Sequence, residues 1–427
     1  MNGGSMDVDR IGSCGILSAR IIATTARMGL LIFFLALCVR QGLGQGASTI
    51  ILGPIEGELE KKQIALDLGT TSQSIVPIIS KAIAVHGGLR LASPKQSQVS
   101  CSFSLIDGNR ISVGLSKGNP KQKVKELSAD GSSLEASVLS ACDRMVEALL
   151  GTPGFFSGQL CFLSNLSGKK EIFTSNSLMT SARPQTSYGK ITFNPSWDNT
   201  GRGIFFTSNR KVFNNVYHLD LTSRKVSTIA NYRGNNLRAV QNPRSSQIAL
   251  ILSTTGNPEV WLAANPQAKP QRLTRNKSNE SGPSWSADGR RLIITSDSRG
   301  KPQIYEVSLS TGRLSRIATN ISSHCTEASW NPKDGNRFAF TAAVGGGFQV
   351  CEYSFATRTS KILTKGPRDG MQPFWANDGR HLYFTERSAS GHTRIMILDT
   401  EFDEARPIAL HDSNFGSCSQ VSFRYPG

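Results

Sequence analysis

The hydrophobic pattern of this chain repeats over its second half. Tryptophans mark the repeat: Trp285, Trp330 and Trp375 follow one another at intervals of 45 residues, and Trp197 precedes Trp285 by 88. The double interval contains a degenerate copy, in which Gln241 replaces the tryptophan. A tight turn rich in Gly, Pro, Asn and Asp follows each marker. The pattern therefore indicates five full units.

Three more apolar runs follow the marker in every unit, and each has the length of a β-strand. The second runs are 204–208, 248–252, 292–295, 338–341 and 382–385; the third are 216–219, 260–262, 304–307, 350–353 and 395–398; the fourth are 227–229, 271–273, 315–317, 361–363 and 407–409. Four short strands in about 40–45 residues, repeated in tandem, are typical of propeller blades. A ring of blades buries the faces that one small sheet leaves exposed.

Incomplete units stand at both ends of the repeats. Residues 159–163, 171–173 and 183–186 supply a second, third and fourth strand without a first, and residues 420–424 supply one extra strand. If the extra strand completes the first unit, six blades close into a ring without an open edge. We therefore predict a mainly β fold, with a six-bladed β-propeller over 153–427 closed by the C-terminal strand. An open β-sandwich is the alternative, and the fixed repeat argues against it.

The segment before the propeller has a different pattern. Apolar residues at helical spacing predict helices over 76–85 and 134–150, the second ended by Gly151 and Pro153. The expected strands are 48–52, 98–105 and 110–115. We predict a small N-terminal α/β domain over 47–152, with its helices on one side of a sheet.

The N-terminus has the pattern of an export signal. Arg20 and Arg27 precede the apolar run 29–39. This run is too short for a permanent membrane anchor but has the length of a signal-peptide core. We predict a signal peptide over 1–46 and a soluble, secreted mature chain. Lipoprotein processing at Cys38 is the less favoured alternative, because a leucine precedes this cysteine.

Charge and composition narrow the function classes. The chain has 427 residues, which suits two domains, and a formal charge of +17 from 48 basic and 31 acidic residues. The basic residues are scattered through turns, and no nucleic-acid-binding motif accompanies them. The charge therefore predicts a cationic surface in water, or a face that attracts an anionic protein partner by long-range steering.

No residue pattern supports catalysis or metal binding. The six histidines are dispersed, and the cysteines form no C-x-x-C pair. Gly114–Gly118 matches G-x-S-x-G but lacks the helix that should follow, so a glycine-rich hairpin end explains it better. We predict no enzyme, no catalytic residue, no cofactor and no metal site. Ring closure would bring Cys161 near Cys418, so a disulfide between them stays open.

The repeated pattern x-x-x-Trp-x-x-Asp-Gly-x-x-Leu-x-Phe-Thr, after a signal peptide and a small α/β domain, resembles the TolB family, the periplasmic component of the Tol–Pal system of Gram-negative bacteria. The resemblance is strongest over 282–318 and 326–387. It implies a non-enzymatic periplasmic scaffold that binds the peptidoglycan-associated lipoprotein Pal across one propeller mouth. It also implies a contact with TolA through the N-terminus of the mature chain, here 47–56, and a role in outer-membrane integrity and constriction during division.

The loops that lead into the innermost strands are expected to surround the mouth that receives Pal. The candidate partner contacts are Asn194, Asn236, Arg238, Ser281, Glu327, Met371 and Gln372. A basic mouth would suit the acidic and polar surface of Pal-like domains. The tryptophans are expected to fill the space between neighbouring blades.

Two alternatives come from other classes. The first is the propeller of a prolyl-oligopeptidase-like peptidase without its catalytic domain, since those propellers share the repeated motif. The second is a propeller that binds a small molecule or glycan, whose channel should carry aromatic platforms. In each case we expect a monomer without nucleic acid, associated with membranes only through its partners.

Overall fold

The computed structural model describes residues 63–402 and 405–426. These residues belong to one compact unit. The expected signal peptide (1–46), the expected strand 48–52 and the expected TolA-binding segment 47–56 all lie outside the described residues.

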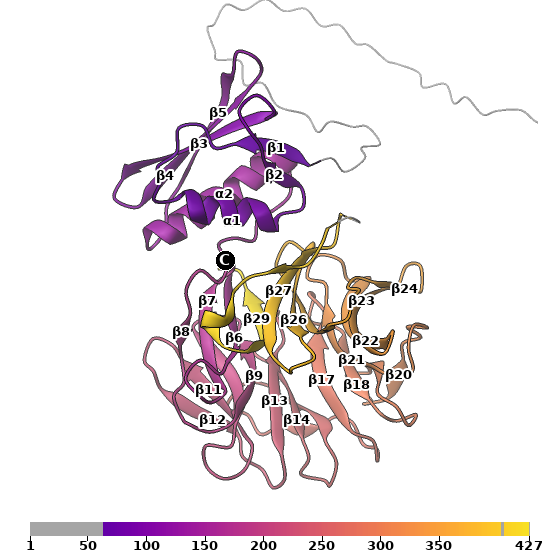
Figure 1. Cartoon of the computed structure of the whole chain (residues 1–427). Coiled ribbons are helices and arrows are strands. Elements are labelled where there is room, and N and C mark those ends of the chain that lie inside the picture. The colour runs from indigo at the N-terminus through magenta and orange to yellow at the C-terminus, as the bar shows by residue number, and fades with distance from the viewer. Residues whose placement is uncertain (1–62, 403–404, 427) are drawn as a thin grey trace, which may run out of the picture. The chain divides into compact units, whose positions relative to one another are not determined.

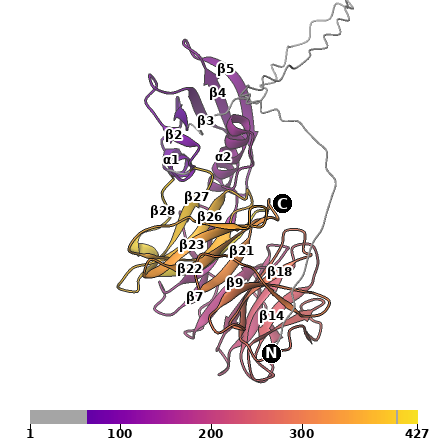
Figure 2. The ribbon, with the colours of Figure 1, turned by 90° about the vertical axis from the view of Figure 1, so that its right-hand side faces the viewer.

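A five-stranded sheet and two helices precede the repeats. The strand order is β2-β1-β3-β4-β5, in which β1 runs parallel to β2 and β3 and the other neighbours are antiparallel. The elements are β1 (Ile64–Asp67), α1 (Val76–Val85), β2 (Leu89–Leu91), β3 (Val99–Asp107), β4 (Arg110–Lys117), β5 (Gln122–Ala129) and α2 (Leu134–Leu150). Both helices cover the same face of the sheet, as predicted (Figures 1 and 2).

Helix α2 spans the residues that its apolar spacing predicts. The side chain of Ser133 accepts a hydrogen bond from the amide of Ala136 at 3.2 Å and caps the first turn. Gly151 ends the helix with a φ of 69°, a left-handed conformation that glycine adopts without strain. The buried face, which includes Val138 and Met145, packs into the core beneath the sheet.

Six antiparallel four-stranded sheets form the propeller, and we number them as blades 1 to 6. Blade 1 contains β9 (Thr192–Trp197), β10 (Gly203–Ser208), β11 (Asn215–Asp220) and β12 (Val226–Ala230); blade 2 contains β13 (Asn236–Gln241), β14 (Ile248–Leu252), β15 (Glu259–Ala263) and β16 (Gln271–Arg272); blade 3 contains β17 (Glu280–Trp285), β18 (Leu292–Ser296), β19 (Gln303–Val307) and β20 (Leu314–Arg316). Each predicted strand of these three blades has a counterpart.

The remaining blades complete the ring. Blade 4 contains β21 (Cys325–Trp330), β22 (Arg337–Val344), β23 (Gly347–Ser354) and β24 (Thr359–Ile362); blade 5 contains β25 (Asp369–Trp375), β26 (His381–Arg387), β27 (Thr393–Asp399) and β28 (Ile408–Ala409); blade 6 contains β29 (Cys418–Arg424), β6 (Gln159–Ser164), β7 (Glu171–Asn176) and β8 (Arg183–Pro184). A short 3-10 helix, η1 (Ser413–Phe415), precedes β29.

The C-terminal strand closes the propeller. Strand β29 pairs antiparallel with β6, in a register that places Cys418 opposite Ser164 and Arg424 opposite Gln159. Figure 1 shows this yellow strand beside the purple strand β6. As the first strand of blade 6, β29 also contacts the innermost strands of blades 1 and 5, so the six innermost strands form a continuous circle.

The tryptophan markers lie between blades, as predicted. Trp197 packs in one cluster with Leu163 and Ile172 of the preceding blade 6, and its indole N–H donates to the carbonyl of Ser422 in β29 at 3.2 Å. Trp375 is only 2% exposed and donates in the same way to Ser329 of blade 4 at 3.1 Å. Each contact therefore joins a blade to the one before it.

No disulfide joins Cys161 to Cys418, a pairing that the sequence leaves open. Both cysteines are free and buried. Although β6 and β29 are neighbours, Cys161 pairs with Ser422, whereas Cys418 pairs with Ser164. Cys161 belongs to the core between blades 6 and 1, and Cys418 belongs to the core that contains the N-terminal domain. The register of the two strands keeps the sulfur atoms apart.

Candidate partner-binding site

A cavity of about 460 Å³ lies at the centre of the propeller, and residues of all six innermost strands line it. We call it the funnel. It extends from the middle of these strands to the turns that follow them, where Asn199, Pro243, Ala287, Pro332 and Asn377 contribute to its wall. The expected mouth was at the loops that precede the innermost strands, so the wall extends further toward the opposite end of these strands than the sequence suggested.

One position of the repeat forms a ring in the wall of the funnel. The residue three places before each marker lines the cavity in every blade, with Gln241 as the marker of blade 2 and Phe423 as the marker of blade 6. These six residues, which we call the channel ring, are Asn194, Arg238, Gly282, Glu327, Gln372 and Gln420. The pairing register of the innermost strand shifts at this position in five blades, as in a β-bulge. In blade 2 the shift falls one residue earlier, at Leu237, and Arg238 pairs with Ile251.

The bulges place most of the channel ring in an uncommon backbone conformation. Five of the six residues have a φ between 53° and 56°, and Arg238 is the exception. Residues other than glycine rarely adopt this left-handed region, and such positions cluster at binding sites. Since four of these five carry side chains, the strain is a repeated feature of the wall.

Hydrogen bonds link neighbouring members of the channel ring. The amide of Gln372 donates to Glu327 Oε2 at 3.2 Å, and the amide of Gln420 donates to Gln372 Oε1 at 3.3 Å. The amide of Asn194 then donates to Gln420 Oε1 at 2.7 Å. Each side chain thus satisfies the backbone of the following blade, which fixes blades 4, 5, 6 and 1 around the axis.

The chain of hydrogen bonds stops at Arg238. Its buried Nε atom has no hydrogen-bond partner, and its guanidinium forms no ion pair among the described residues. Burial lowers the pKa of Arg238, and the charge of Glu327 opposes this shift. An Arg side chain stays protonated in proteins, so the funnel contains a cation with unused donors. Gly282, the next member of the ring, has no side chain to approach it.

Charged groups in the funnel wall balance one another. Asp198 and Glu327 are acidic, and Arg238 and Arg424 are basic. Burial raises the pKa of the Asp198 carboxyl, but hydrogen bonds from His218 and Thr200 outweigh it and leave the pKa below its usual value. The expectation of a basic mouth is therefore not met by the wall of the funnel.

The structure brings four of the seven candidate partner contacts together. Asn194, Arg238, Glu327 and Gln372 all belong to the channel ring. The other three do not line the funnel: Asn236 is buried and holds the loop before β13 through bonds to Tyr232 and Asn214, while Ser281 and Met371 precede ring residues. Whether any of the seven contacts a partner stays a prediction.

Sequence reasoning missed two members of the ring, Gly282 and Gln420. The signal that finds them is the repeat itself, because each lies three residues before the marker of its blade. The four marker tryptophans also line the funnel but are at most 8% exposed, so their rings offer little surface for stacking a sugar. Within the described part of the chain, no group of metal-ligating side chains lines the funnel.

The sequence pattern of the TolB β-propeller domain, PD40, matches residues 146–420. The chain belongs to the TolB β-propeller family. The match includes all five repeated blades and most of blade 6.

Curated TolB proteins resemble parts of the chain. The Tol-Pal system protein TolB of Desulfosudis oleivorans is 30% identical over 135 residues, which cover 32% of this chain and 31% of that protein. The protein of the same name from Francisella tularensis subsp. tularensis is 26% identical over 225 residues, or 51% of each chain. The chain thus spans about half the length, or less, of these TolB relatives.

A solved TolB structure shares the fold over a longer stretch. The crystal structure of TolB from Acinetobacter baumannii superimposes with a TM-score of 0.73 at 18% identity, over 85% of this chain and 96% of that one. At this identity the likeness shows the fold alone. Among the residues that the structure describes, no helix has both the length and the apolar composition needed to cross a membrane.

Proposed function

We propose that this TolB-family chain is a non-enzymatic periplasmic scaffold of the Tol–Pal system. In this proposal a Pal-like lipoprotein binds at the funnel, and a TolA-like protein binds the N-terminal segment 47–56. Binding both partners would support outer-membrane integrity and constriction during division. Family membership and the name of the curated relatives support this role.

The observation that carries the proposal is the unsatisfied cation in the channel ring. Arg238 lies half-buried in the wall without an ion pair among the described residues, and its buried Nε has no hydrogen-bond partner, which is costly for a polar atom. A partner segment that enters the funnel with a carboxylate or a backbone carbonyl would complete the hydrogen bonding of Arg238. The cavity of about 460 Å³ admits side chains or a loop tip rather than a folded domain.

The wall supports protein recognition better than catalysis. Amide, hydroxyl and apolar groups dominate the lining, and no His approaches a Ser or Cys in it. The side chains of Glu327, Gln372 and Gln420 are already committed to hydrogen bonds that hold the blades together. Such a rigid polar surface favours binding without a reaction, which separates the proposal from a peptidase propeller.

Calorimetric titration tests the proposal. The exported chain is titrated with an OmpA-family Pal-like lipoprotein domain, using wild type, Arg238→Ala and the matched control Arg313→Ala. Arg313 is exposed and lies outside the funnel. We expect Arg238→Ala to weaken binding tenfold or more, because a buried partner carboxylate or carbonyl would lose its donor. Failure of the wild type to bind, or equal binding by both variants, would contradict the proposal.

A further inference from the structure

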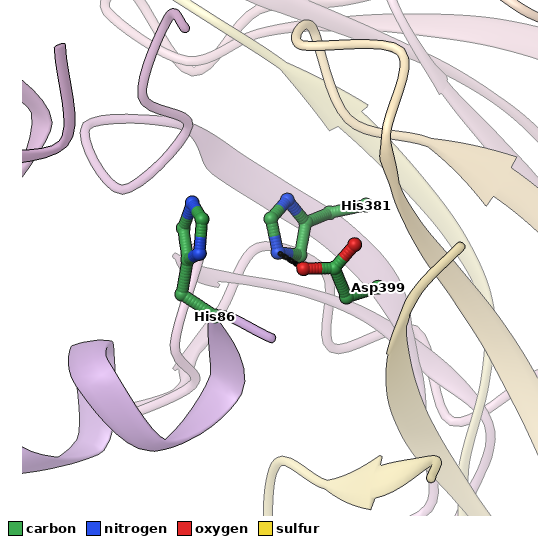
Figure 3. A group of neighbouring side chains, drawn as sticks. All are labelled: His86, His381 and Asp399. Atoms are coloured by element: carbon green, nitrogen blue, oxygen red, sulfur yellow. Dashed lines mark ion pairs between the residues drawn. The ribbon is translucent and has the colours of Figure 1, made fainter. Parts of the chain in front are cut away.

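A second cluster of chemically capable side chains lies outside the funnel. Helix α1 ends at His86, and the corner His86–Gly88 presses against blade 5. His381 begins β26 and Asp399 ends β27. Figure 3 shows the two imidazole rings and the carboxylate converging. One donor atom from each of the three lies within 4.8 Å of the others.

His381 points a free nitrogen into this cluster. The side chain is fully buried, and its Nδ1 bonds Asp378 Oδ2 at 2.5 Å. An ionised carboxylate can only accept, so Nδ1 donates to Asp378. Burial lowers the pKa of His381, but the carboxylates of Asp378 and Asp399 outweigh it and raise the pKa to about 9, so a metal ion competes with a proton for the lone pair of Nε2. Nε2 has no hydrogen-bond partner, and its nearest charged atom is Asp399 Oδ2 at 3.4 Å.

His86 approaches from the N-terminal domain. Its ring centroid is 4.8 Å from that of His381, and only 1% of the residue is exposed. The Nδ1 atom accepts a hydrogen bond from the amide of Gly88 at 3.2 Å, which is long for such a bond. This bond uses the one lone pair of Nδ1, on the side of the ring that faces the cluster (Figure 3), so a metal ion bound at this atom would replace the N–H of Gly88.

Gly87 and Arg380 set the position of Asp399. Arg380 donates to both carboxylate oxygens, at 2.8 and 2.6 Å. A Cβ at Gly87 would stand 2.6 Å from Asp399 Oδ2, so no larger residue fits between helix α1 and this carboxylate. Oδ1 also accepts from the amide of Glu401 at 3.1 Å, so it is Oδ2 that keeps a second lone pair for a ligand.

We propose that His86, His381 and Asp399 form a binding site for one divalent transition-metal ion, of the zinc or cobalt type, that joins the N-terminal domain to blade 5. Two imidazoles and one carboxylate form a donor set that binds such ions in preference to calcium or magnesium. Asp378 behind His381 reproduces the carboxylate–histidine arrangement that orients metal ligands. Phe155 stacks on His381 at 4.2 Å and makes the surroundings apolar.

The charge of the cluster supports a bound cation. With neutral imidazoles, the carboxylates of Asp378 and Asp399 carry two negative charges against the single positive charge of Arg380. A buried site tolerates an uncompensated charge poorly. A metal ion at the three donors supplies the missing positive charge; a proton on His381 is the competing occupant.

A metal ion here would strengthen a junction of two parts that apolar packing and hydrogen bonds, such as that from Lys81 Nζ to the carbonyl of Leu410 at 2.8 Å, already hold together. The cluster lies in the same core as helix α1 and Tyr383 of blade 5. Because the ligands come from both parts, binding is coupled to their association. The inference is independent of what occupies the funnel.

Cobalt titration tests the proposal directly. The chain is stripped with EDTA, desalted and titrated with Co²⁺, while the visible d–d absorption and the thermal midpoint are recorded. We expect one Co²⁺ per chain, a raised midpoint and displacement of the absorption by Zn²⁺. Asp378→Asn should bind Co²⁺ 10–100-fold more weakly, as changes behind a ligating histidine do.

Two ligand variants and a matched histidine complete the test. His86→Phe keeps an aromatic ring beside Phe156 and should weaken Co²⁺ binding by more than Asp378→Asn does. If His86→Phe does not fold, His86→Gln replaces it. His218→Phe removes a histidine that pairs with Asp198 elsewhere and should bind Co²⁺ as the wild type does. Absence of stoichiometric binding to the wild type, or unchanged binding by the His86 variants, would overturn the proposal and leave a proton-linked ion-pair cluster.

Discussion

Single residues in the wall of the propeller do two tasks at once. Gln372 accepts from the amide of Gln420, and its own amide donates to Glu327. The same residue lines the funnel. A residue in this position has to hydrogen-bond to two neighbouring blades while it faces the cavity. This explains why polar residues with several hydrogen-bonding groups occupy most of the ring.

The sequence predicts some residues of the channel ring and misses others. The frame of the repeat singles out Asn194, Glu327 and Gln372. It predicts Ser281 instead of Gly282 for two reasons. Glycine has no side chain that could contact a partner, and the bulge shifts the alternation of side chains along the strand. Gln420 is missed because Phe423 replaces the tryptophan that marks other units.

The cluster of His86, His381 and Asp399 has no signal in the sequence. His86 and His381 are almost three hundred residues apart, and neither stands in a ligand motif. Only the packing of helix α1 against blade 5 brings them together. Sequence spacing predicts local ligand pairs, whereas this one depends on a tertiary contact.

Glu280 makes the stability of blade 3 depend on pH. Burial raises the pKa of its carboxyl to about 7 from 4.5, against hydrogen bonds from Asn276, Thr274 and Ser296. Between these values the unfolded chain has released its proton while the folded chain keeps it, so stability falls as pH rises and levels off above pH 7. We expect the free energy of unfolding of Glu280→Gln to be higher than that of the wild type by roughly 1–2 kcal/mol at pH 8 and to differ little from it at pH 4.5.

Urea unfolding at the two pH values measures this difference. Glu147→Gln, an exposed change on helix α2, is the control and should show no pH-dependent gain. An equal advantage of Glu280→Gln at both pH values would show that titration of this carboxyl is not the cause.

Strands that are buried on both faces can be predicted from their apolar sequence pattern, and exposed strands cannot. The second strands of the blades, such as β14 and β18, are buried at every position, and their apolar runs give their bounds almost to the residue. Strand β5 is exposed over most of its length and reads Gln-Lys-Val-Lys-Glu-Leu-Ser-Ala. It pairs with β4 through its backbone, which leaves no apolar pattern to detect.

Three of the four marker tryptophans, Trp197, Trp285 and Trp375, donate an indole hydrogen bond to the innermost strand of the preceding blade, whereas Trp330 donates to Gly335 of its own blade. Replacing Trp375 by Phe removes the indole donor to Ser329 and leaves this carbonyl buried without that partner. We expect a loss of about 1–3 kcal/mol in the free energy of unfolding. Trp261→Phe is the matched control, because the buried indole N–H of Trp261 has no partner to lose.

Chemical denaturation of the two variants decides the role of the indole. Trp375→Phe should be the less stable of the pair by at least about 1 kcal/mol. If Trp261→Phe is equally or more destabilising, ring size rather than the hydrogen bond between blades accounts for the markers.

The molecule as a whole depends on its last strand. Deleting residues 417–427 removes β29, which leaves β6 with an unpaired edge and takes Val421 and Phe423 out of the core. An open edge of this kind invites pairing between chains. We expect the truncated chain to form oligomers or aggregates, measured by size-exclusion chromatography with light scattering. Deleting only residues 426 and 427 should leave a monomer, and a monomeric 1–416 chain would contradict this account of closure.

The most direct test of the account asks where the partner touches the propeller. A photo-crosslinking amino acid replaces Ala287 in the wall of the funnel or Arg313 outside it, and each chain is irradiated with a Pal-like OmpA-family lipoprotein. We predict a crosslinked product from position 287 and none from position 313. A lipoprotein that binds both chains but crosslinks only from position 313 would contradict recognition at the funnel.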